Sequence, residues 1–410
     1  MIIEPYTLFG RIPLYRDNFG HYATDPLWEK DLTLHFRYIK NFKICCPVEQ
    51  VEKHDESWSR IKNLSDRNVI ALRRDHGWIS VVRNLVPNAL KVRSALAKTH
   101  IAHSGGAGWA FPVSYYILLI RIFLRFKWII VIESSPFRMP ARGQFSLRRF
   151  LSHHVHTFFL KRCVRSADAR ILTSKSFAEI FDCTDLTCFI SPAVWVDQSN
   201  MISAEENDAW KQDGRDRTRF LFPARLNQDK GTQTVLDAIH LLEKRHVENE
   251  IPIPKVDIIG HGPLADRCRQ FAANYPDDLT CFHEPLPYGP EFFAFLRGYD
   301  AIIVANLQDE QPRIIFDAYS QGLACISSET GGTRDLIDPG KTGSFFKAGD
   351  EVSLANRLAE YANSATVLRD MGSAALRKVS EHTHENMHRR REDFLKQSLG
   401  LSLECHGWSE

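Results

Sequence analysis

Residues 301–332 read AIIVANLQDEQPRIIFDAYSQGLACISSETGG, and this stretch constrains the fold more than any other. Two apolar runs, Ala301–Asn306 and Leu323–Ser328, flank a polar turn and a segment of helical composition. Pro312 suits the first position of that helix, because its missing N–H costs no hydrogen bond there. A strand, a helix and a second strand in this order predict one unit of a parallel sheet.

The same alternation extends along the rest of the chain. In the second half we interpret Arg219–Ala224, Lys255–Gly260 and Leu279–Phe282 as further strands, and Lys230–Arg245, Leu264–Ala273, Glu291–Gly298 and Val352–Ala362 as helices. Apolar runs in the first half predict strands at Phe42–Pro47, Val69–Leu72, Thr99–Ser104, Trp128–Glu133, Ala169–Thr173 and Cys188–Pro192. This pattern predicts an α/β protein with Rossmann-like, doubly wound parallel sheets.

Length and composition indicate two globular domains. The chain has 410 residues, more than one compact core accommodates, and 44% hydrophobic with 25% charged residues excludes a disordered protein. The polar stretch 197–218 has no apolar periodicity and separates the halves. We therefore predict an N-terminal domain at 1–198, a linker at 199–217 and a C-terminal domain at 218–385. Residues 386–410 are expected to form a helix and tail that cross back to the N-terminal domain.

The charge is distributed unevenly. Residues 1–200 contain 28 Lys and Arg against 17 Asp and Glu, whereas the remainder contains 24 against 33. Within the basic half, residues 115–128 and 146–165 mix basic and apolar positions at roughly helical spacing. Basic amphipathic helices are typical of attachment to an anionic membrane surface. Core helices whose arginines reach solvent would show the same pattern. The charges in both runs argue against a helix that spans the membrane.

Other signals are few. The first residues lack the basic and apolar regions of a secretory signal, and the nine cysteines have neither metal-ligand nor disulfide spacing. These features predict a cytoplasmic protein, or one at the inner face of the plasma membrane. No nucleic-acid-binding motif is recognisable, so we expect no nucleic acid as a partner. No suitable turn carries an Asp-x-Asp signature, so we expect neither a metal nor a cofactor.

Turns that directly follow strands are where doubly wound sheets bind ligands. Asp309 stands in the turn after Ala301–Asn306, and Asp317 follows inside the predicted helix. A helix N-terminus between two acids suits a ligand with phosphate and several hydroxyls, such as a nucleotide sugar. Alternatively, Asp309 could cap the helix or favour its dipole, and Asp317 could be an ordinary solvated acid.

Two cations follow another strand. Arg225 and Lys230 lie in the turn after Arg219–Ala224, where they could clamp a diphosphate and stabilise it as a leaving group. Surface cations in a loop commonly have no such role. Gly260 and Gly262 follow the next strand, and they allow either close approach to a ligand or simply a tight turn.

The first half has its own candidates. Gly105 and Gly106 end the Thr99–Ser104 strand and could line a cleft. Glu133 is the only acid between His76 and Ala167 and ends another strand. Its carboxylate could accept a proton from an acceptor hydroxyl or orient the acceptor, or it could form a buried ion pair with Arg138 or a neighbour.

Taken in order, four segments have a family likeness: FLFPARLNQDKGTQTVLDAI (220–239), VDIIGHGPLADR (256–267), GYDAIIVANLQDEQPRIIFDAYSQGLACISSETGGTRDLI (298–337) and GKTGSFF (340–346). They resemble retaining glycosyltransferases of the GT-B fold, specifically glycosyltransferase family 4. The resemblance implies two Rossmann-like domains that face each other across a cleft. It also implies a nucleoside diphosphate sugar as donor.

The resemblance assigns roles residue by residue. Asp309 and Asp317 occupy the positions of the family's paired acids, which implies that Asp317 holds the ribose hydroxyls and Asp309 contacts the donor sugar. Arg225 and Lys230 match the cations that bind the diphosphate. The expected donor site is completed by Gly260, Gly262, Glu310 and the backbone N–H groups of Arg313, Ile314 and Ile315.

The chain departs from the family pattern in two places. Both paired acids are aspartate where the family has glutamate, which shortens their reach by one methylene. The histidine that many members carry after a first-domain strand is missing, and Glu133 stands at the comparable place.

These features predict a transferase that moves a sugar from a UDP- or GDP-linked donor to an acceptor hydroxyl with retention. Asp309 and Glu133 are the expected catalytic residues, and Gly105, Gly106 and Arg138 are expected to contact the acceptor. A glycan or lipid-linked saccharide of cell-surface polysaccharide synthesis is the expected acceptor. Two alternatives stay open: a nucleotide-sugar epimerase of related fold, and a weakly active scaffold that binds nucleotide sugar.

Overall fold

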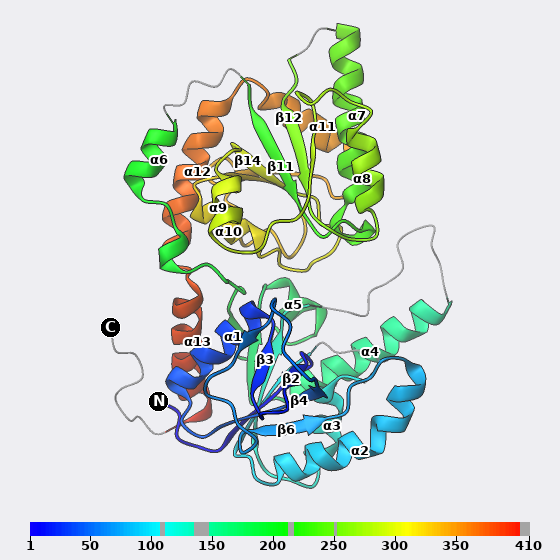
Figure 1. The fold of residues 1–410 in the computed structure, drawn as a ribbon, viewed down its shortest axis with the longest axis vertical. Helices are drawn as coiled ribbons and strands as arrows, with labels where there is room; N and C mark the ends of the chain where they lie inside the picture. Colours follow the sequence, from blue (N-terminus) through cyan, green and yellow to red (C-terminus); the bar gives the residue numbers. More distant parts are fainter. Residues whose placement is uncertain (107–110, 135–146, 212–216, 250–251, 402–410) are drawn as a thin grey trace. The chain divides into compact units, whose positions relative to one another are not determined.

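The computed structural model describes residues 1–106, 111–134, 147–211, 217–249 and 252–401. The chain divides into two compact units (Figure 1). The N-terminal unit comprises Met1–Pro192 together with His388–Glu410, and the C-terminal unit comprises Ala193–Met387. Each unit is built on its own sheet, so the predicted two-domain α/β class is confirmed. Residues 197–211 of the polar stretch between the halves belong to the C-terminal unit, which begins at Ala193.

The sheet of the C-terminal unit has six strands in the order β13-β12-β11-β14-β15-β16, and every pairing is parallel. The strands are β11 (Arg219–Pro223), β12 (Lys255–Ile259), β13 (Phe282–His283), β14 (Ala301–Val304), β15 (Ala324–Ser328) and β16 (Gly343–Phe346). Strands β11 and β14 are neighbours at the centre, with Phe220 beside Ala301 and Leu221 beside Ile302. The chain order reverses between these two strands, which makes their carboxyl ends the topological switch point of the sheet.

Hydrophobic cores cover both faces of this sheet. Phe220, Phe222 and Ile303 belong to one cluster of buried side chains, whereas Leu221 and Ile302 belong to another. Successive strand residues point to opposite faces, so a doubly covered sheet needs apolar residues at every position. The helices of this unit are α6 (Ala204–Lys211), α7 (Thr232–Asn249), α8 (Ala265–Ala272), α9 (Pro290–Leu296), α10 (Ile314–Ser320), α11 (Glu351–Glu360) and α12 (Ala365–Val379).

Two predicted helix starts are wrong by a short distance. The helix expected to open at Pro312 begins at Ile314. A turn precedes it, in which Ile315 N donates a hydrogen bond to Pro312 O. The helix expected from Lys230 is a 3-10 turn, η2 (Gln228–Lys230), followed by α7. Gly231 lies between them in the left-handed region, with φ 67°, which ends the first turn.

The sheet of the N-terminal unit runs β10-β9-β8-β7-β1-β4-β2-β3-β5, and β6 pairs with β4. Its strands are β1 (Tyr6–Phe9), β2 (Leu14–Arg16), β3 (Tyr22–Thr24), β4 (Phe42–Gln50), β5 (Ser59–Arg60), β6 (Val69–Leu72), β7 (Ile101–Gly105), β8 (Lys127–Ile132), β9 (Ala169–Leu172) and β10 (Phe189–Ile190). The prediction of parallel strands alone is wrong at one edge, where β2 pairs with β3 and β3 with β5 in antiparallel fashion.

Two elements of this unit differ from the sequence prediction. Strand β1 was not predicted, although it lies in the middle of the sheet between β4 and β7. Residues 115–128 are not one amphipathic helix, because α3 (Val113–Ile120) ends at Arg121 and Trp128 is fully buried in β8. The other helices are α1 (Pro26–Tyr38), α2 (Trp78–Leu96), α4 (Leu147–Ser166) and α5 (Ser176–Ile180). Helix α13 (His384–Leu399) starts in the C-terminal unit and belongs to the N-terminal unit from His388 on.

Candidate functional site

The loops that follow β11 and β14 meet at the carboxyl edge of the C-terminal sheet. Lys230 Nζ lies 3.1 Å from Glu310 Oε2, and Leu307 N donates to Asp229 O at 2.9 Å. Gly231 permits this approach, because a Cβ at this position would lie 2.0 Å from Ala305 O. The structure therefore brings one of the predicted cations and one of the predicted acids into direct contact.

Asp309 is exposed, and its carboxylate is oriented by a third loop. Gly331 N donates to Asp309 Oδ1 at 2.7 Å, from the turn that follows β15. A Cβ on Gly332 would lie 2.3 Å from Glu310 O, so this turn packs tightly against the loop of Asp309. Asp309 does not cap α10, whose N-cap residue is Arg313. The capping interpretation is therefore wrong.

Asp317 is almost fully buried, with 7% of its surface exposed, so it is not an ordinary solvated acid. It lies in the first turn of α10, and Tyr288 OH donates to its Oδ1 at 2.9 Å. Burial, together with the charge of Asp317, raises the pKa of Tyr288, so the phenol stays protonated and remains a donor. Tyr288 fixes the direction of the carboxylate and was not singled out in the sequence.

The start of α10 is held by a second element that sequence reasoning missed. The guanidinium carbon of Arg313 lies 5.0 Å from the centroid of the Trp195 ring, in a cation–π contact. Gln311 exchanges two hydrogen bonds with the backbone of Ala193, at 2.7 and 3.0 Å. These contacts connect residues far apart in sequence, so no local sequence pattern predicts them.

Three remaining donor-site predictions have different environments. Arg225 is exposed in the loop after β11. Gly260 and Gly262 have φ values of 150° and 145°, and a Cβ on either would collide with backbone oxygen of that same loop, on Ala224 or Leu226. These glycines therefore allow the loops after β11 and β12 to pack together, and they position Arg225 indirectly.

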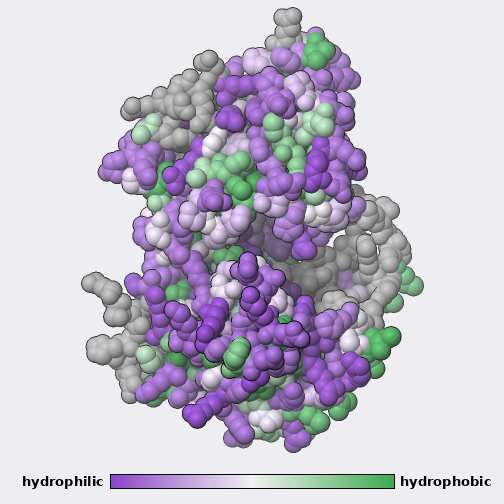
Figure 2. Space-filling model, in the orientation of Figure 1, coloured by the Kyte–Doolittle hydropathy of each residue, from purple (hydrophilic) through white to green (hydrophobic). Residues whose placement is uncertain are grey.

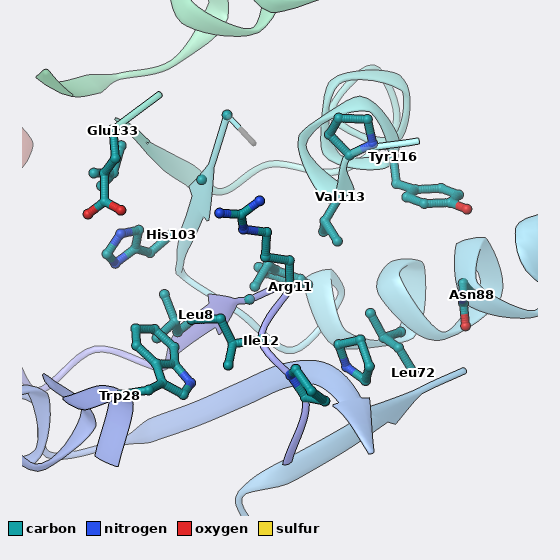
Figure 3. Close-up of a pocket in the computed structure, with 18 of the residues that line it drawn as sticks. Leu8, Arg11, Ile12, Trp28, Leu72, Asn88, His103, Val113, Tyr116 and Glu133 are labelled. Atoms are coloured by element: carbon teal, nitrogen blue, oxygen red, sulfur yellow. The ribbon is translucent and has the colours of Figure 1, made fainter. Parts of the chain in front are cut away.

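A cavity lies at the carboxyl edge of the N-terminal sheet. It encloses about 600 Å³, and three predicted residues, Gly105, Gly106 and Glu133, line it. Glu133 is exposed on its rim, which does not fit the buried ion pair considered for it. Figure 3 shows its carboxylate on the same side of the cavity as the ring of His103. Arg138 lies outside the described residues. Other residues on the wall are Leu8, Gly10, Arg11, Ile12, Trp28, Asp31, Arg73, Arg74, Asp75, Asn88, Tyr116 and Arg391.

His103 is a buried titratable group at the β7 end of this cavity. Its Nδ1 lies 2.6 Å from Tyr6 OH, and only 8% of its surface is exposed. Burial and the nearby His35 and Arg391 hold the pKa of His103 well below its usual range, so the imidazole is neutral. Burial raises the pKa of Tyr6, so the phenol keeps its proton. Where that proton is donated to Nδ1, the hydrogen of the His103 ring is on Nε2 and faces away from Tyr6.

Comparison with solved structures identifies the architecture. Sucrose-phosphate synthase from Thermosynechococcus elongatus superposes with a TM-score of 0.69 over 97% of this chain and 99% of its own, at 15% identity. HepE from Anabaena, solved in complex with UDP and glucose, gives a TM-score of 0.64 over 96% of this chain and 99% of its own, at 13% identity. The fold is GT-B.

Comparison of sequences concerns mainly the C-terminal unit. Residues 217–364 match the family model of glycosyl transferases group 1, which covers every donor-site residue predicted here. A D-inositol 3-phosphate glycosyltransferase from Arthrobacter is 23% identical over 156 residues, or 38% of this chain. A second protein of that name from Paenarthrobacter aurescens is 23% identical over 164 residues. The matched region spans 37% and 39% of the length of these two relatives.

Proposed function

We propose that the protein is a glycosyltransferase that uses a nucleoside diphosphate sugar and retains the anomeric configuration. The observation that carries this proposal is the contact of Lys230 with Glu310 at the switch point, in a segment whose sequence also contains Asp309 and Asp317. The match of residues 217–364 to glycosyl transferases group 1 supports it. The binding of UDP and glucose by HepE favours a UDP-linked donor.

We assign each residue of the donor site the role that the family resemblance implies, and its surroundings support that role. The Lys230 ammonium has three N–H donors, so the contact with Glu310 leaves it able to bind the diphosphate. Arg225, on the same loop, adds a second cation for the leaving group. Asp317, oriented by Tyr288, would accept hydrogen bonds from the ribose hydroxyls. Asp309, held by Gly331 N, would contact the donor sugar.

The reaction needs a way to remove the proton of the acceptor hydroxyl. The first candidate is an oxygen of the departing diphosphate, because the acceptor hydroxyl attacks the sugar from the same face that the diphosphate leaves. Glu133 on the rim of the N-terminal cavity is the second candidate for this proton. The cations at Lys230 and Arg225 stabilise the charge that develops on the diphosphate as the bond to the sugar breaks.

The donor assignment is tested with the variants Lys230→Ala and Asp317→Asn against a control, Lys341→Ala, at an exposed lysine of the same unit. Calorimetric titration with UDP and GDP should show binding to the control protein and weakened binding to both site variants. Turnover of a UDP-sugar panel should separate the alternatives, since an epimerase releases an altered sugar nucleotide without any acceptor. Binding of neither nucleotide to the unmodified protein would refute the proposal.

We also propose that the N-terminal unit docks on an anionic membrane surface. Apolar side chains are exposed along α2, at the end of α3 and along α4; they are Ile79, Val82, Leu85, Val86, Leu90, Leu119, Ile122, Phe123, Leu147, Leu151, Val155 and Phe158. Helix α3 packs against both α2 and α4, so these side chains share one region. Figure 2 shows hydrophobic residues at the edge of the unit where α2 and α4 lie in Figure 1. We call this set the α2–α4 face.

The charges around the α2–α4 face select the partner. Arg83, Arg93 and Arg125 are exposed and form no ion pair within the part of the chain that the structure describes. Apolar side chains that enter the headgroup region and cations that contact lipid phosphates together suit a bilayer with anionic lipid. None of the described helices has the length and apolar content needed to cross a membrane. A peripheral enzyme of this kind would act on an acceptor presented at the membrane, such as a lipid-linked saccharide.

A further inference from the structure

Arg391 is a buried cation at the wall of the N-terminal cavity, and nothing in the donor chemistry uses it. It comes from α13, only 6% of its surface is exposed, and it lines the cavity. Its Nε donates to Ser191 Oγ at 3.1 Å, whereas its enclosed Nη2 has no hydrogen-bond partner among the described residues. A guanidinium keeps its charge at every pH at which proteins fold, so burial without an anionic partner is unfavourable.

A buried acid on the wall of this cavity already has other partners. Asp31 lines the same cavity and is 7% exposed. Its Oδ1 lies 3.0 Å from His388 Nε2, and its Oδ2 lies 3.4 Å from His35 Nδ1. No ion pair joins Arg391 to Asp31 or to another acid in the described ranges. The charge of Arg391 is therefore left for a group that enters the cavity.

Two further donors reach the same cavity. His103 Nδ1 is hydrogen-bonded to Tyr6 OH, and in the tautomer in which Tyr6 donates, the ring presents its hydrogen on Nε2. Arg11 extends from the loop after β1 toward the space between His103 and Val113 (Figure 3). Among the acids on the wall, Asp75 accepts a hydrogen bond from Asn84 Nδ2 at 2.8 Å, and Glu133 is exposed on the rim. The cavity thus offers donors in its interior and a carboxylate at its mouth.

We propose that this cavity binds an anionic group, a phosphate or a carboxylate, on the acceptor substrate, with Arg391 as its principal ligand. Arg11 and His103 Nε2–H would supply further hydrogen bonds to the anion. This inference rests on the proposed function, because it names the chemical class of the acceptor. The acceptor hydroxyl would then lie toward the rim, where Glu133 stands, and the anion would be held inside. The subsite binds and orients and takes no part in bond making.

The test uses the full-length protein with UDP at saturating concentration, so that the donor site does not take up added anions. Inorganic phosphate, glucose 6-phosphate, glucuronate and neutral glucose are titrated by calorimetry. The variants are Arg391→Gln and Arg11→Gln, and the matched control is Arg390→Gln, an exposed arginine next to Arg391 on the same helix. Arg11→Gln changes an exposed side chain, so it keeps the test decisive should Arg391→Gln fail to fold.

We expect phosphate or one of the two charged sugars to bind and glucose to bind more weakly. Arg391→Gln should weaken anion binding by about 10-fold or more, and Arg11→Gln by a smaller factor, as expected for charge-assisted hydrogen bonds. A preference for glucose 6-phosphate or for glucuronate distinguishes a phosphorylated acceptor from a carboxylated one. Arg390→Gln should bind as the unmodified protein does.

Failure of every anion to bind, or equal losses in the Arg391→Gln and Arg390→Gln variants, would overturn the subsite. Anion binding of the same strength in Arg391→Gln and the unmodified protein would do so as well. Titration with UDP alone reports on the donor site, so a failed subsite and a failed glycosyltransferase assignment give different results. If the unmodified protein does not bind UDP, the proposed function is refuted. If it binds UDP but none of the anions, only this inference is refuted.

Discussion

Replacing Lys230 by alanine should weaken UDP binding without weakening the binding of uridine. The side chain is partly buried, with 23% exposed, and lies beside Glu310 at the end of β11. A charge-assisted hydrogen bond to a phosphate contributes about 1.5–3 kcal/mol, which corresponds to about 10- to 140-fold in the dissociation constant. Uridine lacks the diphosphate, so its affinity should change by less than about 2-fold, because ribose and base contacts remain.

The effect on stability should be small. The ion pair between Lys230 and Glu310 is partly exposed, and such pairs contribute about 0.2–1 kcal/mol to the free energy of unfolding. Chemical denaturation checks this value, and calorimetric titration with UDP and uridine measures the two affinities. The control Lys341→Ala should bind both ligands as the unmodified protein does. Equal losses for UDP and uridine, or no loss for either, would refute the assignment of Lys230 to the diphosphate.

Three further predictions concern other parts of the structure. Tyr288→Phe removes the hydrogen-bond donor that orients Asp317. It should weaken the binding of UDP and of uridine equally, by about 2- to 10-fold, because such a hydrogen bond contributes about 0.5–1.5 kcal/mol. Unchanged calorimetric titrations with both ligands would contradict this role of Tyr288. Gly231→Ala should lower the free energy of unfolding by more than about 1–2 kcal/mol, because the new Cβ would clash with Ala305 O and the backbone is left-handed. A loss below about 0.5 kcal/mol in a denaturation curve would argue against the close approach of the loops after β11 and β14. Val82→Glu, on the α2–α4 face, should reduce co-sedimentation with vesicles of phosphatidylcholine and phosphatidylglycerol several-fold; undiminished sedimentation, or equal binding to phosphatidylcholine alone, would count against membrane docking.

Much of the fold could be predicted because long apolar runs mark strands that are buried on both faces. Val69–Leu72 is found as predicted, and the other strand predictions differ by a few residues at their ends. Strand β1 is not predictable in this way, because its segment has no flanking helical pattern that would mark the strand. The spacing of apolar residues in 115–128 predicts one helix, because that spacing gives no sign of the turn after Ile120, where α3 ends.

The candidate site was predictable where it depends on position after a strand. Asp309 and Lys230 each follow a central parallel strand, and neighbouring parallel strands place their carboxyl ends together. The residues that orient the site were not predictable in this way. Tyr288 and Trp195 reach Asp317 and Arg313 from distant segments, so their roles depend on tertiary packing. Arg391 likewise reaches its cavity only because α13 returns to the N-terminal unit.

The most direct test of the donor site is a crystal structure of the protein with UDP bound. We predict that the diphosphate lies within hydrogen-bonding distance of Lys230 Nζ and that the ribose hydroxyls donate to the carboxylate of Asp317. UDP bound with its diphosphate away from the loops that follow β11 and β14 would contradict the central claim. So would a ribose that makes no contact with Asp317.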